Sequence, residues 1–463
     1  MTYIDIIERT VAAHAENLKS VADKIWSFAE IRYEETKSAA LLADELEKSG
    51  FAVTRNAGNI ETAFVATYGE GQPVVAILGE FDALTGLSQR GGVAGYDPIV
   101  EGGNGHGCGH NLLGTGSLAA ILALRACKDE LKLPGTIRYY GCPAEEGGGG
   151  KAYMAREGLF ADVDVAFTWH PWDENLAYNA RMLATNQLYF TFRGTSAHAG
   201  FEPHLGRSAL DAVELTNVGS NYLREHIIQD ARIHYAITDA GGRAPNVVQS
   251  SAQVLYKVRA PRMDQVRDIT ERVKDVARGA ALMTGTKLEI TFDAASADLV
   301  PNVTLARMMH QEFERLGVAG FSNSEKDFAG SIQKTFAPEV QARIAKRGKV
   351  LSEDLNAFEE EPGFLHGSTD VGDVSWLVPT GQVYVATEAY GTPPHTWQMV
   401  AQGTSGYAHK GMLQAGKVMA ASAVRVLTDP ALVVAAKNEH REQLDGESYV
   451  PLIPADATPQ RLR

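Results

Sequence analysis

Short apolar runs alternate with helical segments along most of this chain, and this alternation constrains its fold more than any other feature. Apolar residues recur at helical spacing through the first 50 residues, which predicts two helices there. Strand-like runs then alternate with helices as far as residue 185. The predicted strands are 63–68, 73–78, 136–142 and 163–169, and the predicted helices are 111–128 and 151–157. This order is typical of an α/β sheet with helices on both faces.

The pattern changes between residues 186 and 299. There the order is strand, helix, strand, strand, helix, strand, which is typical of a ferredoxin-like α+β sandwich. The predicted elements are 186–193, 208–225, 233–238, 250–258, 263–283 and 287–292. We therefore expect an α/β domain with a mixed sheet, formed by 1–185 and 300–463, and a smaller inserted domain, 186–299. The last roughly 20 residues are polar and contain proline, so a loose tail is expected.

Composition excludes several classes of partner. Lys and Arg number 43 against 57 Asp and Glu, a formal net charge of −14. Such a surface repels phosphate, so neither a nucleic acid nor an anionic membrane is expected as a partner, although a local basic pocket for an acidic substrate remains possible. The three cysteines are too few for a disulfide framework. With charged residues at the N-terminus and no apolar run of the roughly 20 residues that span a membrane, a cytoplasmic protein is predicted.

Glycine clusters at 102–109 and 147–150 match no phosphate-binding motif. No Gly-Lys-Ser/Thr occurs, and neither cluster has the Gly-x-Gly-x-x-Gly pattern after a strand. Tight turns that let the backbone approach another group explain them better than nucleotide binding does.

Four short segments carry residue types that suit catalysis. Cys108 and His110 lie two residues apart in a glycine-rich loop and can face one ion, because thiolate and imidazole are common zinc ligands. The alternative is a buried cysteine and a helix-capping histidine. Glu145 and Glu146 follow a predicted strand, so one could bind a metal while the other contacts a water molecule. Alternatively, they are a solvated pair that begins a helix.

His170 and His395 each follow an apolar strand-like run, although a lone histidine is more often structural. The four segments together are more informative than each alone, because all fall at predicted carboxyl ends of strands in one sheet. One thiolate, three imidazoles and one carboxylate suffice for two adjacent ions that share a ligand. Paired ions polarise a carbonyl and activate water, and the remaining carboxylate then serves as a general base.

At these segments the chain resembles the di-metal amidohydrolases and peptidases that include aminoacylase, glutamate carboxypeptidase and the auxin-conjugate amidohydrolases. The resemblance covers nearly the whole chain. It rests on GHGCGHNLLG (105–114), CPAEEGGGGK (142–151), GTSAHAG (194–200), STDVGDVSW (368–376) and HTWQMVAQG (395–403).

The resemblance implies a role for each residue. Cys108 would bridge two divalent ions, manganese or zinc, with His110 and His170 completing one site. Glu146 and His395 would complete the other site, and Glu145 would be the general base.

The inserted domain would serve as a lid and dimerisation domain. It would present His198 across a dimer interface to the substrate carbonyl oxygen. Asn246 and Arg259 would contact the free carboxylate of the substrate, for which the planar guanidinium is well suited. A homodimer is expected, with a heterodimer of related subunits as the alternative.

One departure from the family concerns Glu80. Many relatives carry His-x-Asp where this chain has Glu80-Phe81-Asp82, and the auxin-conjugate branch likewise lacks that histidine and uses the cysteine. The sequence leaves the role of Glu80 open, and one possibility is that it contacts the ligands rather than the ions.

The resemblance implies a metal-dependent amidohydrolase that cleaves the amide bond of an N-acyl or N-aroyl amino acid, such as p-aminobenzoyl-glutamate. The alternatives are hydrolytic deamination of an arylamine and a non-catalytic metal-binding subunit on the same scaffold. The intact set of candidate ligands argues against the latter.

Overall fold

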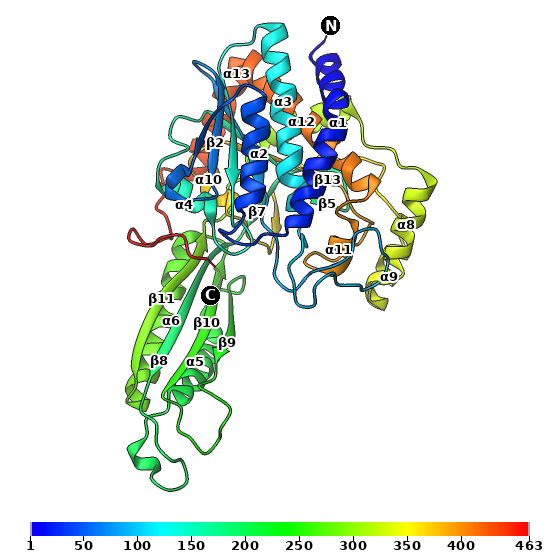
Figure 1. Ribbon diagram of the computed structural model, residues 1–463. Coiled ribbons are helices and arrows are strands. Elements are labelled where there is room, and N and C mark those ends of the chain that lie inside the picture. Colours follow the sequence, from blue (N-terminus) through cyan, green and yellow to red (C-terminus); the bar gives the residue numbers. More distant parts are fainter. Residues whose placement is uncertain (1, 462–463) are drawn as a thin grey trace.

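The computed structural model describes residues 2–461 and contains a large mixed sheet and a separate, smaller antiparallel sheet (Figure 1). The large sheet has the order β1-β2-β4-β3-β5-β13-β6. Its strands are β1 (Ala52–Arg55), β2 (Phe64–Gly69), β3 (Val74–Glu80), β4 (Thr136–Cys142), β5 (Val165–Trp172), β6 (Leu176–Tyr178) and β13 (Thr380–Ala386). The central strands β4, β3, β5 and β13 are parallel, so their carboxyl ends lie at one edge of the sheet.

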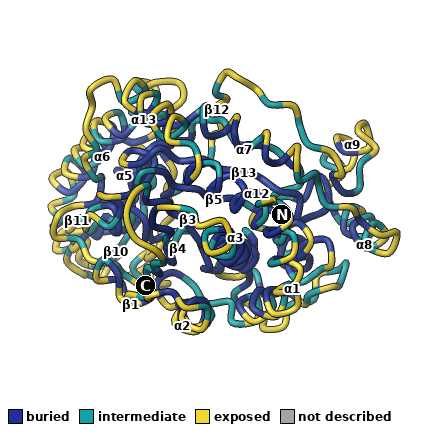
Figure 2. Tube along the Cα trace, turned by 90° about the horizontal axis from the view of Figure 1, so that it is seen from above, coloured by how far each residue is buried: buried dark blue, intermediate teal, exposed yellow. Residues whose placement is uncertain are grey.

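Both faces of the large sheet are buried, which explains why its strands are apolar runs rather than alternating ones. In β3, Val75 and Ile77 face one apolar core while Val74 and Ala76 face another. Helices on the first face are α1 (Tyr3–Phe28), α2 (Thr36–Lys48), α3 (His110–Leu131), α7 (Val303–Leu316) and α12 (Gly406–Thr428). The second face carries α4 (Gly150–Arg156) and α10 (Val371–Ser375). In Figure 2, β3, β5 and β13 run through the buried interior.

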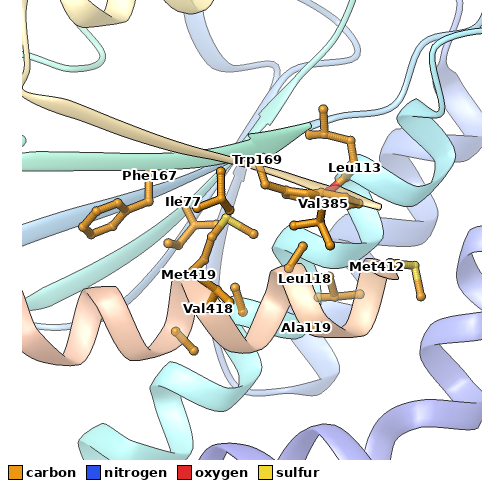
Figure 3. Packing of buried hydrophobic residues seen from close by; sticks show 14 of the residues in the cluster. Ile77, Leu113, Leu118, Ala119, Phe167, Trp169, Val385, Met412, Val418 and Met419 are labelled. Carbon is orange, nitrogen blue, oxygen red and sulfur yellow. The ribbon is translucent and has the colours of Figure 1, made fainter. Parts of the chain in front are cut away.

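Helices α3 and α12 approach each other closely beside the sheet (Figure 3). A Cβ atom built on Gly416 of α12 would lie 2.7 Å from the Cβ of Ala119 and 2.9 Å from the carbonyl oxygen of Gly116, both in α3. A Cβ on Gly116 would in turn meet the ring of Trp169 at 2.7 Å. Glycine at these positions therefore sets the distance between the two helices and β5.

The small sheet has the order β11-β8-β10-β9 with all neighbours antiparallel, as a ferredoxin-like sandwich requires. Its elements are β8 (Ala184–Arg193), α5 (Ala209–Leu223), β9 (Arg232–Asp239), β10 (Ser251–Ala260), α6 (Met263–Thr284) and β11 (Lys287–Ser296). Burial alternates strictly along β10, because one face packs on α5 and α6 and the other does not. The fold class expected from the sequence is confirmed, and β8 and β11 begin and end within a few residues of the predicted insertion boundaries.

The remaining elements are short or peripheral. They are β7 (Ala180–Met182), β12 (Gly363–Leu365), α8 (Asn323–Gln333), α9 (Pro338–Ala345), α11 (Trp397–Gln402) and α13 (Pro430–Leu444). The C-terminal segment is not the loose tail that its composition suggests. Leu452 and Ile453 are buried in the core beneath the small sheet, and the Tyr449 hydroxyl donates to Asp373 at 2.7 Å. Burial of these apolar side chains fixes a segment that has no helix or strand of its own.

Among residues 2–461, no single helix is both long and apolar enough to cross a membrane. Helices α12 and α13 pass such a test only when taken together, and the pair is bent by 101°.

The close contact of α3 and α12 predicts opposite effects for two Gly→Ala substitutions in helices. Gly416→Ala should destabilise the protein by about 1–3 kcal/mol, because the new methyl group forces two helix backbones apart. Gly279→Ala in α6, where no atom lies within 4 Å of the new Cβ, should stabilise by about 0.5–1 kcal/mol through helix propensity. Thermal and urea unfolding of both variants measure the difference. Equal effects at the two sites would contradict the packing argument.

Candidate metal centre

A cleft of about 390 Å³ lies between the carboxyl edge of the large sheet and one face of the small sheet. The large-sheet wall carries predicted site residues, namely Cys108, Glu145, Glu146, His170 and His395. The opposite wall comes from β8, β10 and β11, and it includes Arg259. Leu365 and residues 367–370 also line the cleft.

Cys108 belongs to two groups of possible metal ligands. Its Sγ, with His110 and His170, forms one group in which all ligand atoms lie within 4.8 Å of one another. Cys108, Glu146 and His395 form the other. The Cys108 Sγ lies 3.4 Å from His170 Nε2, and Glu146 Oε2 lies 3.4 Å from His395 Nε2. The five residues singled out as ligands thus converge, and Cys108 is common to both groups.

Local structure explains how these side chains reach one place. Cys108 lies in the loop just before α3, and His110 is the first residue of that helix. His170 lies near the carboxyl end of β5, and Glu146 lies in the turn after β4. His395 has a left-handed φ of 57°, and its backbone N–H donates to the carbonyl of Gly107 at 2.9 Å. This bond holds the His395 segment against the cysteine loop.

Each buried histidine in the first group is held by its Nδ1 atom. His110 Nδ1 lies 2.8 Å from Asp82 Oδ1, and His170 Nδ1 lies 2.7 Å from the carbonyl oxygen of Pro171. An N–H at Nδ1 leaves Nε2 as the lone-pair donor, which is the arrangement usual for metal-binding histidines. In the described residues, His110 Nε2 and Glu146 Oε1 are buried without a hydrogen-bond partner. These unpartnered donor atoms, together with the thiol, fit a pair of divalent cations.

The electrostatics of the cleft also favour bound cations. Burial, and then the nearby Glu146, raises the pKa of the Cys108 thiol well above its usual range. Burial likewise raises the pKa of Glu146. A cation between them would reverse both effects, because it stabilises the thiolate and the carboxylate. Burial and His110 lower the pKa of His170 to about 4, which keeps its imidazole neutral, as a ligand must be.

Glu145 lies beside the ligand groups without belonging to the two that share Cys108. Its Oε2 is 4.0 Å from His110 Nε2, and its side chain lines the cleft. Burial, together with the charges of Glu80, Asp370 and Glu146, raises the pKa of Glu145 well above its usual range. A raised pKa makes the Glu145 carboxylate a stronger base than an ordinary glutamate.

Glu80 contacts both a candidate ligand and a buried lysine. Its Oε2 lies 3.3 Å from His110 Nε2, and its Oε1 lies 2.6 Å from Lys151 Nζ. Lys151 also binds Asp370 at 2.5 Å, and all three side chains are almost fully buried. The lysine therefore contacts two carboxylates directly behind the ligands and offsets the charge of one of them. Because Glu80, His110 and Glu145 also have ligand atoms within 4.8 Å of one another, Glu80 lies closer to the ligands than the sequence alone indicates.

His198 and Asn246 do not line the cleft of this chain. They are exposed and adjacent, since the Ala199 N–H donates to the Asn246 carbonyl at 2.9 Å. β8 begins at the cleft with Thr185 and runs to Arg193, about 26 Å away at 3.3 Å per residue, before the chain reaches His198. Of the three residues assigned to the inserted domain, Arg259 alone borders the cleft, and its Nη1 donates to Ser368 Oγ at 2.8 Å.

Sequence reasoning missed several residues of this site. They are Asp82 as a partner of His110, Lys151 and Asp370 as an ion pair, Lys257 on the inner wall, and Trp172 and Tyr384 as aromatic lining. The sequence does contain a signal for Lys257, because this residue lies two positions before Arg259 on a strand of alternating burial and therefore shares its face. The pairing of Lys151 with Asp370 spans 219 residues, and no local pattern indicates it.

The buried lysine predicts a stability effect that depends on pH. Lys151→Met would leave Glu80 and Asp370 buried without their cation, and it should cost about 3–5 kcal/mol. Burial already raises the pKa of Asp370, and loss of the lysine would raise it further, so the loss of stability should be greatest at alkaline pH and smaller at acidic pH, where this carboxyl group is protonated. Urea unfolding across pH measures this. Lys24→Met, at an exposed position of α1, is the control. If the free energy of unfolding falls no more in Lys151→Met than in the control, Lys151 is not needed to stabilise the two buried carboxylates.

Comparisons with known proteins bear on this arrangement. Residues 76–456 match the peptidase family M20/M25/M40. The chain is 46% identical over 474 aligned residues to the B subunit of p-aminobenzoyl-glutamate hydrolase from Escherichia coli (strain K12), covering 99% of this chain and 98% of the relative. It is 30% identical to the Xaa-Arg dipeptidase of Mus musculus, covering 96% of this chain and 95% of the relative.

Solved structures share the fold. An aminobenzoyl-glutamate utilization protein from Klebsiella pneumoniae matches with a TM-score of 0.59 at 19% identity, covering 88% of this chain and 98% of that one. A dinuclear metal-binding M20 peptidase from Bacillus subtilis matches with a TM-score of 0.55 at 16% identity, covering 90% and 99%. The family resemblance inferred from the motifs is confirmed. The chain therefore belongs to peptidase family M20/M25/M40, and it is a metallohydrolase that acts on amide bonds, similar to the B subunit of p-aminobenzoyl-glutamate hydrolase.

Proposed function

We propose that this protein hydrolyses the amide bond of N-aroyl amino acids of the p-aminobenzoyl-glutamate type. The observation that carries this proposal is the match, over nearly the full length of both chains, to the B subunit of p-aminobenzoyl-glutamate hydrolase. The shape of the cleft supports it, because Trp172 and Tyr384 offer aromatic surface next to the candidate ligands. Their ring centroids are 5.2 Å apart, and His170 lies against both. An aroyl ring fits such a wall.

We assign two divalent cations, manganese or zinc, to the two ligand groups. Cys108 would be shared, His110 and His170 would hold one ion, and Glu146 and His395 the other. A mixed set of thiolate, imidazole and carboxylate is intermediate in softness and suits both metals. When bound, such ions polarise an amide carbonyl and lower the pKa of water.

Glu145 is the residue that moves the proton in this proposal. Its carboxylate would take a proton from the water that attacks the amide carbon, and it would then deliver that proton to the leaving amine nitrogen. The raised pKa of Glu145 suits the first step, because a carboxylate with a higher pKa is a stronger base toward the attacking water. On the opposite wall, Arg259 would hold the free carboxylate of the substrate.

The positions of two residues in the inserted domain, 186–299, support a dimer. His198 and Asn246 would enter the cleft of a second copy, where the His198 ring would donate a hydrogen bond to the carbonyl oxygen as it gains negative charge. We propose a homodimer. The alternative is a heterodimer with a chain similar to the other subunit of p-aminobenzoyl-glutamate hydrolase, because relatives of both kinds match this sequence. The unpaired cysteines, with Cys108 as a ligand, support a reducing compartment such as the cytoplasm.

The general-base assignment predicts that Glu145→Gln keeps its metal and loses its activity. Loss of the proton acceptor should lower kcat for p-aminobenzoyl-glutamate by about 10²–10⁴-fold. Metal analysis and a hydrolysis assay measure the two quantities on the same sample, and Glu101→Gln, at an exposed position, serves as the matched control.

Removal of metal by a chelator should abolish turnover in the unmodified protein. Near-normal activity of Glu145→Gln would remove Glu145 from the role of base. Full activity without metal, or release of ammonia from an arylamine in place of amide cleavage, would overturn the proposed function.

The shared cleft predicts complementation between two inactive variants. His198→Ala and Glu145→Gln should each be nearly inactive alone, but a mixed dimer would contain one cleft with both residues intact. Mixing equal amounts of the variants under conditions of protomer exchange should therefore restore about a quarter of the activity, since about half of the dimers are hybrids and each hybrid has one intact cleft of two. Mass spectrometry verifies exchange. Proven exchange without recovery would contradict a His198 that acts across the interface.

A further inference from the structure

We infer that Lys257 and Arg259 form a two-carboxylate site, in which Lys257 binds the side-chain carboxylate of an acidic amino acid and so determines the specificity for the leaving group. The inference rests on the proposed function, because it concerns the amino acid that the proposed amide cleavage would release. It adds Lys257, a residue that the family resemblance does not assign.

The two cations share one face of β10. Burial along the strand alternates, so Lys257 and Arg259 point to the cleft while Val258 between them packs against the helices. Two residues along a strand correspond to about 7 Å, a spacing that long side chains can close or widen. The neighbouring strand β8 places the neutral Gln187 opposite Lys257 and Thr185 opposite Arg259, and on the other side β9 places His234 and Arg232 opposite them, so the neighbouring strands bring no acidic residue to either position.

Neither cation has an acidic partner. The Arg259 guanidinium donates to the neutral Ser368 hydroxyl. Within residues 2–461, Lys257 makes no side-chain hydrogen bond or ion pair. Asp293 is the nearest acidic residue on this sheet, but it is already paired with Arg32 at 3.0 Å and accepts from Gln187 Nε2 at 2.5 Å. The inner wall of the cleft therefore carries two uncompensated positive charges.

Holding these charges together is unfavourable in the free protein. Burial and the neighbouring Arg259 lower the pKa of Lys257 to about 8, although Glu145 and Glu146 across the cleft act in the opposite sense. His234 on β9 pairs with Lys257 in register, and burial and the same two cations lower its pKa as well. A dianionic ligand would relieve the repulsion, because each carboxylate would face one cation in a partly desolvated site.

The chemistry of the leaving group fits this pair of charges. Arg259, with its planar guanidinium, suits the α-carboxylate, and the flexible ammonium of Lys257 suits a second carboxylate a few carbon atoms away. Glutamate and aspartate carry two carboxylates, whereas glutamine and the apolar amino acids carry one. The cleft thus selects acidic leaving groups by the position of the second charge.

Binding of the free product amino acid tests the inference without requiring turnover. We expect the manganese-loaded protein to bind L-glutamate about 10–100-fold more tightly than L-glutamine by calorimetry. Lys257→Met should reduce that ratio to within about threefold, and Lys257→Arg should restore most of it, since the charge returns. Lys287→Met, which removes an exposed lysine from the far end of β11 in the same sheet, should keep the ratio of the unmodified protein. If Lys257→Met does not fold, Lys257→Gln takes its place.

Hydrolysis assays separate this inference from the proposed function. The ratio of kcat/KM for p-aminobenzoyl-glutamate over p-aminobenzoyl-glutamine should collapse in Lys257→Met, mainly through KM. A Lys257-dependent preference for glutamate without hydrolysis of either compound would support the inference and overturn the proposed function. Hydrolysis of both compounds at equal rates, or an unchanged ratio in Lys257→Met, would overturn the inference alone. A preference that instead follows a carboxylate on the ring, as in p-carboxybenzoyl-glutamine, would also overturn it.

Discussion

Several acidic groups are buried together at one edge of the large sheet, and the arrangement of the side chains around them depends on this buried charge. Burial raises the pKa values of Cys108, Glu145 and Glu146 together, so the protein alone disfavours their ionised forms. Behind them, Lys151 supplies one positive charge to Glu80 and Asp370. The negative charge thus lies in two layers: an inner layer paired with a buried lysine, and a front layer in which His110 Nε2 and Glu146 Oε1 have no hydrogen-bond partner among the described residues.

The backbone also favours anions at this place. Helix α3 begins at His110, two residues after Cys108, and its N-terminus carries the positive end of the helix dipole. The preceding Gly109 has a φ of 75°, and a Cβ there would lie 3.0 Å from Pro171, the residue that accepts from His170. Glycine at 109 thus lets the cysteine loop pass close to β5, so the thiol and the imidazole can approach each other.

The sequence predicts more of the large-scale fold than of the charge network. Hydrophobic periodicity locates β3, β4, β5 and the small sheet because the signal is repeated over many residues within one element. Motifs locate Cys108 and Glu146 because each lies within a short run of characteristic residues in the sequence. The partners Asp82, Lys151 and Asp370 are joined only by tertiary contacts, so no local pattern pairs them. Tertiary contacts also explain the C-terminal segment. Its polar composition predicts a loose tail, but two buried apolar residues, Leu452 and Ile453, hold it against the protein.

The length of the small sheet allows its two ends to carry two distinct proposed roles. The start of β8 and the end of β10 meet at the cleft, so Lys257 and Arg259 act on whatever lies in the cleft of their own chain. The other end of β8 lies about 26 Å away, which no side chain can bridge. Residues that follow it, such as His198, can reach a cleft only if that cleft belongs to another copy. In the proposed function, the inserted sheet would thus separate selection of the leaving group, within one chain, from contact with the carbonyl oxygen, between chains.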